Sequence, residues 1–164
     1  MERIKKLLAK LGIAEYRITY AADSTAELFF VKKQLDTRRI KDVEKYFVSV
    51  FRTGEKDGAK LKGFTEITLQ PSMTDEEMER ALADAYFAAQ FAMNPWYRAP
   101  DPVCAEKKVK QGELAELPAE QAVGVLAESL YAADVHKDAF VNSAEFFVEH
   151  SVRHIVSSEG TDVS

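Results

Sequence analysis

Apolar positions at the start of the chain recur with the period of a helix. Within residues 2–11 they fall on one stripe, with lysines outside it, as in a short amphipathic helix. The stripe consists of Ile4, Leu7, Leu8 and Leu11. Gly12 follows, and glycine commonly ends a helix because it tolerates the left-handed conformation found there. The pattern therefore predicts a helix up to this glycine.

The next part of the chain alternates between apolar and polar residues, a period of two that is typical of strands. The clearest run is 44–52, and a further run at 61–70 follows the turn dipeptide Asp57-Gly58. Residues 22–25 have the composition of another turn. We therefore expect four or so short strands joined by tight turns in an antiparallel meander.

A helical period returns at Thr74, which forms a capping-box pattern with Glu77. The dipeptide Asn94-Pro95 predicts the end of this helix. A second long helix is expected to begin at Pro118, because proline suits the first turn of a helix. Two strands are expected after that helix, at 140–147 and 148–156.

This order of elements favours an α+β fold, because strands come in runs with helices between the runs. The architecture we expect is a two-layer sandwich, an antiparallel sheet with two long helices packed on one face. We expect residues 1–164 to form a single α+β domain. Residues 94–117 are interpreted as an irregular connecting loop, and residues 157–164 as a polar tail.

Composition restricts the class of protein. The chain has 164 residues, of which 46% are hydrophobic and 30% charged, as in a soluble globular domain. Its one cysteine excludes an intramolecular disulfide. The sequence has no apolar run of about 18–20 residues and no signal-peptide pattern, so we expect no membrane partner and a cytoplasmic location.

The charge is distributed unevenly. The formal net charge of −5 argues against binding nucleic acid through its phosphates. Residues 31–63 nevertheless carry ten Lys or Arg residues against five Asp or Glu residues. We interpret this basic stretch first as solvated strand faces and a turn. The alternative is a docking surface for an acidic partner, with Lys32, Lys33, Arg38 and Arg39 as its testable members.

No motif in the sequence assigns a catalytic residue. Glycine-rich phosphate loops and the G-x-S-x-G elbow do not occur. His150 and His154 are spaced as in a helical zinc site, but their strand-like context would separate them by ~13 Å, which is too far for one ion. An independent metalloenzyme at these histidines is therefore a minor hypothesis. His136 is interpreted as a loop residue and Cys104 as a free, inert thiol.

Two further groups have structural and functional interpretations. Asp75, Glu76 and Glu77 lie where a helix start favours negative charge, so we interpret them as capping residues and not as an acid–base pair. Trp96 and Tyr97 are expected to pin the loop onto the domain, with a ligand or partner anchor as the alternative. We therefore expect no catalytic, cofactor-binding or metal residue in this chain.

Several segments resemble a known family. They are a strand pair at 15–20 and 27–40, "FVSVFR" at 47–52 and "KGFTEITLQPSMTDEEMERALADAYFAAQFAMNPWY" at 62–97. Together they resemble the N-terminal domain of the TldD/PmbA proteins, also called modulators of DNA gyrase. In that family a helix with a "T-x-E-E…A…A…A" pattern ends in "N-P" and an aromatic residue. The stretch "RHIVSSEGTDVS" at 153–164 resembles the family's "r-x-x-x-N-S-x-G", with Ser157 where Asn is usual.

The chain also departs from the family pattern. Asp57-Gly58 and Gly63-Phe64 match its "D-G-x-x-G-F" segment only in part. Members with peptidase activity carry H-E-x-x-x-H and a downstream Cys in their C-terminal part, and neither is present here. The resemblance thus implies that the polar tail leads toward a catalytic domain that this chain lacks. No catalytic residue can be carried over.

The resemblance implies a function for the chain. It would be the non-catalytic N-terminal domain of a metal-dependent peptidase subunit, contributing to subunit assembly and peptide access. Its partners would be a TldD/PmbA-like subunit, in a homo- or hetero-oligomer, and an unfolded peptide. We expect no cofactor in this chain, whereas the parent family uses zinc. The alternative is a freestanding protein-binding module that uses the basic 31–63 meander and the Trp96 loop.

Overall fold

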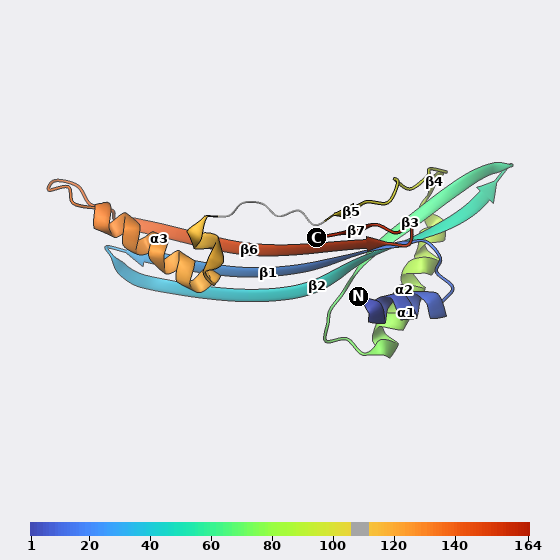
Figure 1. The fold of residues 1–164 in the computed structure, drawn as a ribbon, viewed down its shortest axis with the longest axis horizontal. Helices are drawn as coiled ribbons and strands as arrows, with labels where there is room; N and C mark the ends of the chain where they lie inside the picture. The colour runs from blue at the N-terminus through green and yellow to red at the C-terminus, as the bar shows by residue number, and fades with distance from the viewer. Residues whose placement is uncertain (106–111) are drawn as a thin grey trace. The chain divides into compact units, whose positions relative to one another are not determined.

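The computed structural model describes residues 1–105 and 112–164 and shows an α+β protein (Figure 1). The α-helices are α1 (Glu2–Lys10), α2 (Asp75–Ala88) and α3 (Ala119–Ala133), and the short 3-10 helices are η1 (Ala89–Phe91) and η2 (Glu113–Glu116). The strands are β1 (Tyr16–Val31), β2 (Gln34–Lys56), β3 (Ala59–Leu69), β4 (Met93–Pro95), β5 (Cys104–Ala105), β6 (Ser143–Ser157) and β7 (Asp162–Val163). The α+β class expected from the sequence is confirmed.

The strands form one mixed sheet. Within the described residues it has seven strands in the order β4-β3-β2-β1-β6-β7-β5. The pairs β2–β3, β3–β4 and β6–β7 are antiparallel, but β5 and β7 run parallel. The expectation of a purely antiparallel sheet is therefore wrong for this pair. The parallel pair arises because β5 is supplied by the segment after α2 and not by a hairpin neighbour.

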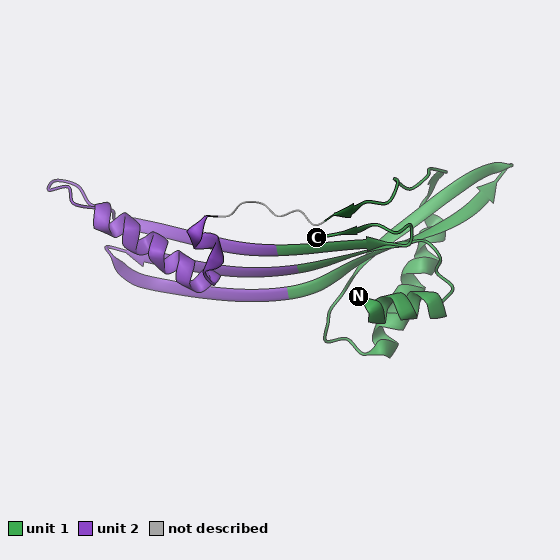
Figure 2. Cartoon of the chain, viewed as in Figure 1, with its two compact units in different colours: residues 1–21, 44–107, 152–164 green, residues 22–43, 108–151 purple. Residues whose placement is uncertain are grey.

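The described chain divides into two compact units (Figure 2). Unit 1 comprises residues 1–21, 44–107 and 152–164, and unit 2 comprises residues 22–43 and 108–151. Each unit has its own hydrophobic cluster. Helix α2 packs in unit 1 and helix α3 in unit 2. The expected pair of long helices sharing one face of the sheet is therefore not confirmed.

The core of unit 1 combines two helices with the sheet. The stripe predicted for α1 is confirmed, since Ile4, Leu7 and Leu8 are buried. Helix α2 contributes a matching stripe, and the strands contribute the facing side chains. The buried residues from α2 and the strands include Met78, Leu82, Ala85, Ile18, Val48, Val50 and Leu69. Burial of these apolar side chains is the main force that holds the two helices on the sheet.

The predicted capping box at the start of α2 is also confirmed. The Thr74 side chain accepts from the backbone N–H of Glu77, and the Glu77 carboxylate accepts from the Thr74 backbone at 2.7 Å. These hydrogen bonds satisfy N–H groups that a helix start leaves without partners. The backbone hydrogen bond from Thr74 lowers the pKa of the Glu77 carboxyl below its ordinary value.

The core of unit 2 is smaller and partly aromatic. Ala119 and Val123 of α3 pack against Ala26 of β1. Rings from three elements gather beside them: Phe30 lies 5.3 Å from Tyr131 and 5.9 Å from Phe146, measured between ring centroids. Their edge-to-face arrangements are favoured by the quadrupoles of aromatic rings. Pro118 directly precedes α3, close to the predicted start.

In the two regions where the sequence predicted strands, the strands are longer and fewer than expected, although the short strands β4, β5 and β7 form elsewhere. β1 runs through residues 22–25, which we expected to form a turn, and β6 is continuous where two strands were expected. The polar residues of β1 are accommodated by cross-strand hydrogen bonding, because the Ser151 hydroxyl donates to Asp23 at 2.8 Å. A polar side chain whose hydrogen-bonding groups find a partner in the neighbouring strand can lie within a strand and need not lie in a solvent-exposed turn.

Two tight turns join the first three strands. The predicted turn at Asp57-Gly58 is confirmed, with φ angles of 53° and 76°. A second two-residue turn lies at Lys32 and Lys33, with φ angles of 48° and 65°. Left-handed φ angles at both central residues are the signature of the type I′ turn, whose twist suits antiparallel hairpins. Lysine gives no sequence signal for that conformation, so this turn was missed.

The segment expected to be an irregular loop is partly structured. Residues 94–117 include most of β4, all of β5 and all of η2, while residues 106–111 lie outside the described residues. The expected polar tail at 157–164 also contains β7. None of the helices in the described ranges is both long and apolar enough to cross a membrane.

Candidate functional site

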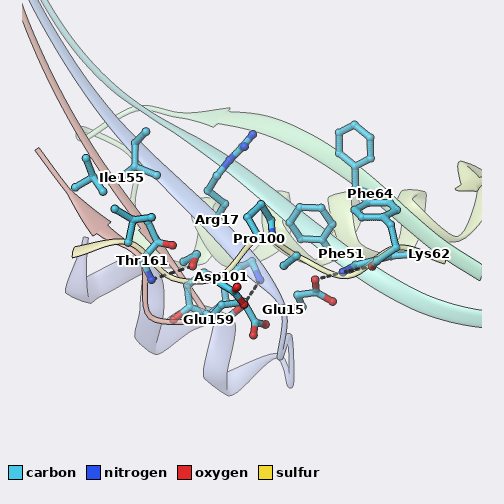
Figure 3. A pocket seen from close by; sticks show the side chains of 17 residues that line it. Glu15, Arg17, Phe51, Lys62, Phe64, Pro100, Asp101, Ile155, Glu159 and Thr161 are labelled. Atoms are coloured by element: carbon cyan, nitrogen blue, oxygen red, sulfur yellow. Dashed lines mark hydrogen bonds and ion pairs between the residues drawn. The ribbon is translucent and has the colours of Figure 1, made fainter. Parts of the chain in front are cut away.

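A cavity of about 580 Å³ lies entirely within unit 1. Its wall comes from β1, β2 and β3, from the segment 97–103, and from the hairpin formed by β6 and β7 (Figure 3). Most of the side chains that line it are aromatic or aliphatic. They include Tyr16, Phe51, Phe64, Tyr97, Val103, Ile155 and Val163. A concave, largely apolar site of this size is the usual form of a ligand pocket.

The most unusual residue of the wall is Lys62 on β3. Lys62 is only 2% exposed, and its ammonium forms an ion pair with Glu15. The ammonium also lies 5.2 Å from the ring centroid of Phe51 and 4.9 Å from that of Tyr97. A buried ammonium needs such compensation, because leaving water without a partner costs several kcal/mol. The interpretation of the whole basic stretch as solvated is therefore wrong at Lys62.

The backbone next to Lys62 packs closely against the chain that follows α2. A Cβ atom at Gly63 would meet the Ala89 carbonyl oxygen and would lie 3.2 Å from the Ala92 carbonyl oxygen. Only glycine therefore allows β3 to approach η1 and the residue that follows it this closely. β4 also pairs with β3 at Leu61–Gly63, which covers the strand on its outer edge.

The turn between β6 and β7 builds the opposite wall. Gly160 has a φ of 97°, and its N–H donates to the Ser157 carbonyl at 3.2 Å. The Ser158 hydroxyl accepts from the Tyr16 N–H at 3.1 Å, and the Ser157 hydroxyl accepts from the Thr161 N–H at 3.3 Å. Both serines line the cavity. The turn is thereby tied to the start of β1.

The segment after α2 crosses the cavity. The Trp96 N–H donates to the Lys60 carbonyl at 3.1 Å, and the Tyr97 carbonyl accepts from the Lys62 ammonium at 3.4 Å. Farther along, the Asp162 N–H donates to the Val103 carbonyl at 2.8 Å. Tyr97 is 40% exposed and lines the cavity. Of the two aromatic residues that we considered as anchors, Tyr97 is thus the one placed in the wall.

The cations of the cavity are matched by anions. Besides the Lys62–Glu15 pair, Arg17 lies 3.5 Å from Glu66. The Ser49 hydroxyl donates to Glu66 at 2.7 Å, which helps to hold that carboxylate in place. Asp101 pairs with Arg98 at 2.5 Å. The remaining charged residue of the wall, Glu159, is exposed and therefore hydrated.

The histidines and the cysteine considered from the sequence do not form a joint site. His150 and His154 both lie on β6, as their strand-like context predicted, and His154 Nε2 is 2.6 Å from Asp162 Oδ1. Cys104 is exposed, and its thiol donates to the Gly160 carbonyl at 3.4 Å. The His136 ring accepts from the Asp138 N–H at 3.2 Å.

The described residues do not fit a zinc ion. Within residues 1–105 and 112–164, no three His, Cys, Asp or Glu side chains come together in a way that could hold a metal. A zinc site in proteins takes at least three protein ligands at about 2.0–2.3 Å. The zinc of the family that the sequence resembles therefore finds no donor set here, and no reaction step is assigned to it.

The basic stretch in unit 2 is largely committed to internal ion pairs. Lys33 pairs with Asp134 at 2.9 Å, Arg39 pairs with Glu27 at 2.9 Å, and Arg38 pairs with Glu120. The hydrogen bond from Lys33 is the main cause that lowers the pKa of the Asp134 carboxyl below its ordinary value. The Arg39–Glu27 pair joins the two strands of the β1–β2 hairpin, and the other two pairs link the hairpin to α3 and its C-terminal end.

The sequence did not identify Lys62 as a site residue, and it indicated Ser157 only as a position of the family's motif and not as part of a cavity wall. A signal for the β6–β7 turn was present, because Ser-Ser-Glu-Gly followed by Thr-Asp-Val combines turn residues with a short alternating run. Lys62 gave no comparable local signal within the predicted strand. Its burial depends on Glu15 and Tyr97, which are distant in sequence.

Comparison with known proteins finds likeness at the level of structure. No protein-family profile matches the chain, and neither does any curated protein. TldE from Thermococcus kodakarensis superposes with a TM-score of 0.66 at 18% identity, covering 98% of this chain and 36% of that one. A putative modulator of a DNA gyrase from Thermotoga maritima gives a TM-score of 0.66 at 15% identity, covering 99% and 35%.

A third solved structure agrees. A putative modulator of DNA gyrase from Bacteroides thetaiotaomicron gives a TM-score of 0.52 at 14% identity, covering 96% of this chain and 37% of that one. The chain thus spans about a third of the length of the structures it matches. At these identities the likeness concerns the fold. The resemblance inferred from the sequence is confirmed at that level: nearly the whole chain has the fold of a part of TldE and of the gyrase-modulator proteins.

Proposed function

We propose that this chain serves as the non-catalytic N-terminal domain of a TldD/PmbA-like, metal-dependent peptidase subunit. In that role it contributes to the assembly of subunits and to the access of unfolded peptides. The observation that carries the proposal is the fold likeness over 98–99% of this chain to about a third of two longer proteins. The sequence pattern that begins at Thr74 and ends at Asn94-Pro95 resembles the helix pattern of the TldD/PmbA family. It supports the proposal independently of the fold likeness.

The architecture suits a scaffold. The sheet is held by two separate cores, and the polar residues that we considered for chemistry are dispersed over several elements. The cavity in unit 1 offers a mostly apolar surface, which suits contact with the apolar side chains of an unfolded chain. Catalysis in the assembly is therefore assigned to residues outside this chain.

The test is a peptidase assay on whole subunits. The complete reading frame that contains this chain is co-expressed with the TldD/PmbA-like subunit from the same source, supplied with zinc, and incubated with an unfolded protein such as reduced casein. We expect zinc-dependent cleavage and co-elution of the two subunits. Failure of the intact pair to cleave, or failure of the subunits to associate, would contradict the proposal.

A set of control variants tests whether side chains of this chain take part in peptide cleavage. Substituting His150→Gln, His154→Gln and Cys104→Ser one at a time is expected to leave cleavage by the assembled pair within about twofold of the unsubstituted rate. A catalytic group typically contributes a hundredfold or more. Loss of that size in one of these variants, with assembly intact, would place catalysis in this chain and overturn the proposal.

A further inference from the structure

The cavity of unit 1 has the properties of a binding site for an uncharged, aromatic side chain. We infer that it binds a phenylalanine- or tyrosine-like side chain of an unfolded peptide together with an adjacent peptide carbonyl. This inference deepens the proposed function and rests on it for one point, that the ligand is part of an unfolded peptide. The binding itself depends only on residues of this chain.

The apolar part of the site is aromatic. Figure 3 shows Phe51, Phe64 and Lys62 grouped at one end of the cavity. The rings of Phe51 and Phe64 are 5.9 Å apart, at an angle of 30°. Phe64 remains 45% exposed, which is unusual for a side chain of this size that faces a cavity. An aromatic ligand would cover this exposed surface and gain offset contacts with the rings.

The charges of the wall favour a ligand without charge. Lys62 is buried, and Glu15 already neutralises it. A ligand carboxylate would therefore meet Glu15, and a ligand ammonium would meet Lys62. A neutral ligand disturbs neither partner of this pair. Breaking a buried ion pair is costly, so charged analogues are expected to bind more weakly.

The hydroxyl groups of the opposite wall supply donors. Ser157 and Ser158 each accept a backbone N–H bond through the hydroxyl oxygen, at 3.3 Å and 3.1 Å. In the described part of the chain, neither hydroxyl donates to another residue. Each therefore keeps an O–H that can donate to a carbonyl oxygen. A peptide carbonyl next to the aromatic side chain is such an acceptor and carries no charge.

The cavity volume of about 580 Å³ is within the range of small-molecule ligand pockets, so it leaves room for a side chain and the adjacent peptide group. The segment 97–103 forms one side of the site, and Trp96, the only tryptophan of the chain, directly precedes it. Fluorescence from Trp96 therefore reports on this segment without any added label. Backbone amide resonances of the lining residues provide a second, residue-specific readout.

The test uses the full 164-residue chain and N-acetyl-phenylalaninamide as the probe. We expect a dissociation constant on the order of 1 mM, because the probe is small, with shifted amide resonances confined to the cavity wall. N-acetyl-alaninamide lacks the ring, N-acetyl-phenylalanine carries a carboxylate and phenethylamine carries an ammonium. Each should bind at least about fivefold more weakly. Equal or tighter binding by either charged analogue would overturn the inference.

Two substitutions locate the site. Phe64→Ala is expected to weaken binding of N-acetyl-phenylalaninamide about tenfold, because it removes the exposed ring of the wall. The matched control is Phe87→Ala, which removes a ring that is 61% exposed on α2 of the same unit and contacts Phe91 outside the cavity. It should leave binding unchanged. Equal weakening by both variants, or an absence of shifts at the wall, would contradict the inference.

A third variant blocks the cavity in a chain that remains folded, so that loss of binding can be distinguished from misfolding. Ala99→Phe places a ring in the space by substituting a half-buried residue of the wall, and it should abolish binding while preserving the dispersed amide spectrum. Retained binding in a folded Ala99→Phe chain would contradict the site. The outcome is separable from that of the peptidase assay, because a chain that binds no amide can still assemble into an active peptidase. Conversely, an inactive assembly leaves amide binding measurable.

Discussion

Gly63 shows how one residue determines the packing of β3, the strand that carries Lys62. β3 and η1 approach so closely there that any side chain would collide with backbone carbonyls. Lys62, its neighbour, has its side chain on the opposite face of the strand, where Glu15, Phe51 and Tyr97 surround the ammonium. The positions of Ala89 and Ala92 could not be inferred from local sequence, since they depend on how a helix returns to the sheet. The glycine therefore accounts for the packing of β3 on this side, and the burial of Lys62 depends on Glu15 and Tyr97 on the other.

Gly63→Ala is expected to destabilise the chain by about 1–3 kcal/mol, the usual cost of overpacking. Its Cβ would lie 3.1 Å from the Ala89 carbonyl carbon, which is backbone and cannot move aside cheaply. Gly124→Ala is the control, because Gly124 lies inside α3 with open space around it, and alanine there should stabilise by about 0.5–1 kcal/mol. Urea unfolding measures both. Equal effects of the two substitutions would contradict this packing.

Lys62→Met tests the buried ion pair. Removing the ammonium leaves the Glu15 carboxylate, whose side chain is 25% exposed, without its cation. We expect a loss of about 1–3 kcal/mol in unfolding free energy, since the remaining charge is partly shielded from water. Adding Glu15→Gln should recover part of the loss in the double variant. Additive losses in the two single variants would show that the residues do not form a coupled pair.

At the scale of elements, features that depend on residues close together in sequence were predicted correctly. Features that depend on residues far apart in sequence were not. The capping box at Thr74 and the Asp57-Gly58 turn follow from residues that are neighbours in sequence, and both are confirmed. The continuity of β1 through residues 22–25 was not predictable, because Asp23 finds a hydrogen-bond donor in Ser151, far along the chain. The Lys32-Lys33 turn depends likewise on a distant partner, Asp134, which Lys33 reaches.

The Lys33–Asp134 pair predicts a pH dependence. The pKa of Asp134 is lowered in the folded chain, so the folded state binds protons more weakly than the unfolded state. The stabilisation is therefore complete above the ordinary aspartate pKa of about 4 and is lost as the pH falls through the lowered value. Urea unfolding between about pH 6 and pH 2 should show a shallower acid loss in Lys33→Met than in the unsubstituted chain. Identical slopes would contradict the assignment.

At the scale of the whole molecule, the two units differ in the size of their cores. The cluster in unit 1 has twelve buried residues, whereas the cluster in unit 2 has three. The sequence indicated the α+β class correctly because hydrophobic periodicity is local. It did not indicate two units, because β1, β2 and β6 each contribute residues to both and no linker marks a boundary.

Hydrogen exchange should distinguish the two units. Amides of α2 are expected to exchange more slowly than those of α3, because local stability follows the amount of buried apolar contact. Leu82→Ala in the larger cluster should cost about 2–5 kcal/mol, and Val123→Ala in the smaller one should cost less. Equal protection of the two helices would contradict a stability difference between the units.

The most direct test of the scaffold role measures casein cleavage by the zinc-loaded, assembled pair of subunits beside the isolated chain. The account predicts cleavage by the pair, none by the 164-residue chain alone, and no loss greater than about twofold in the pair when His150, His154 or Cys104 is substituted. Turnover by the isolated chain that disappears when one of these side chains is changed would contradict it.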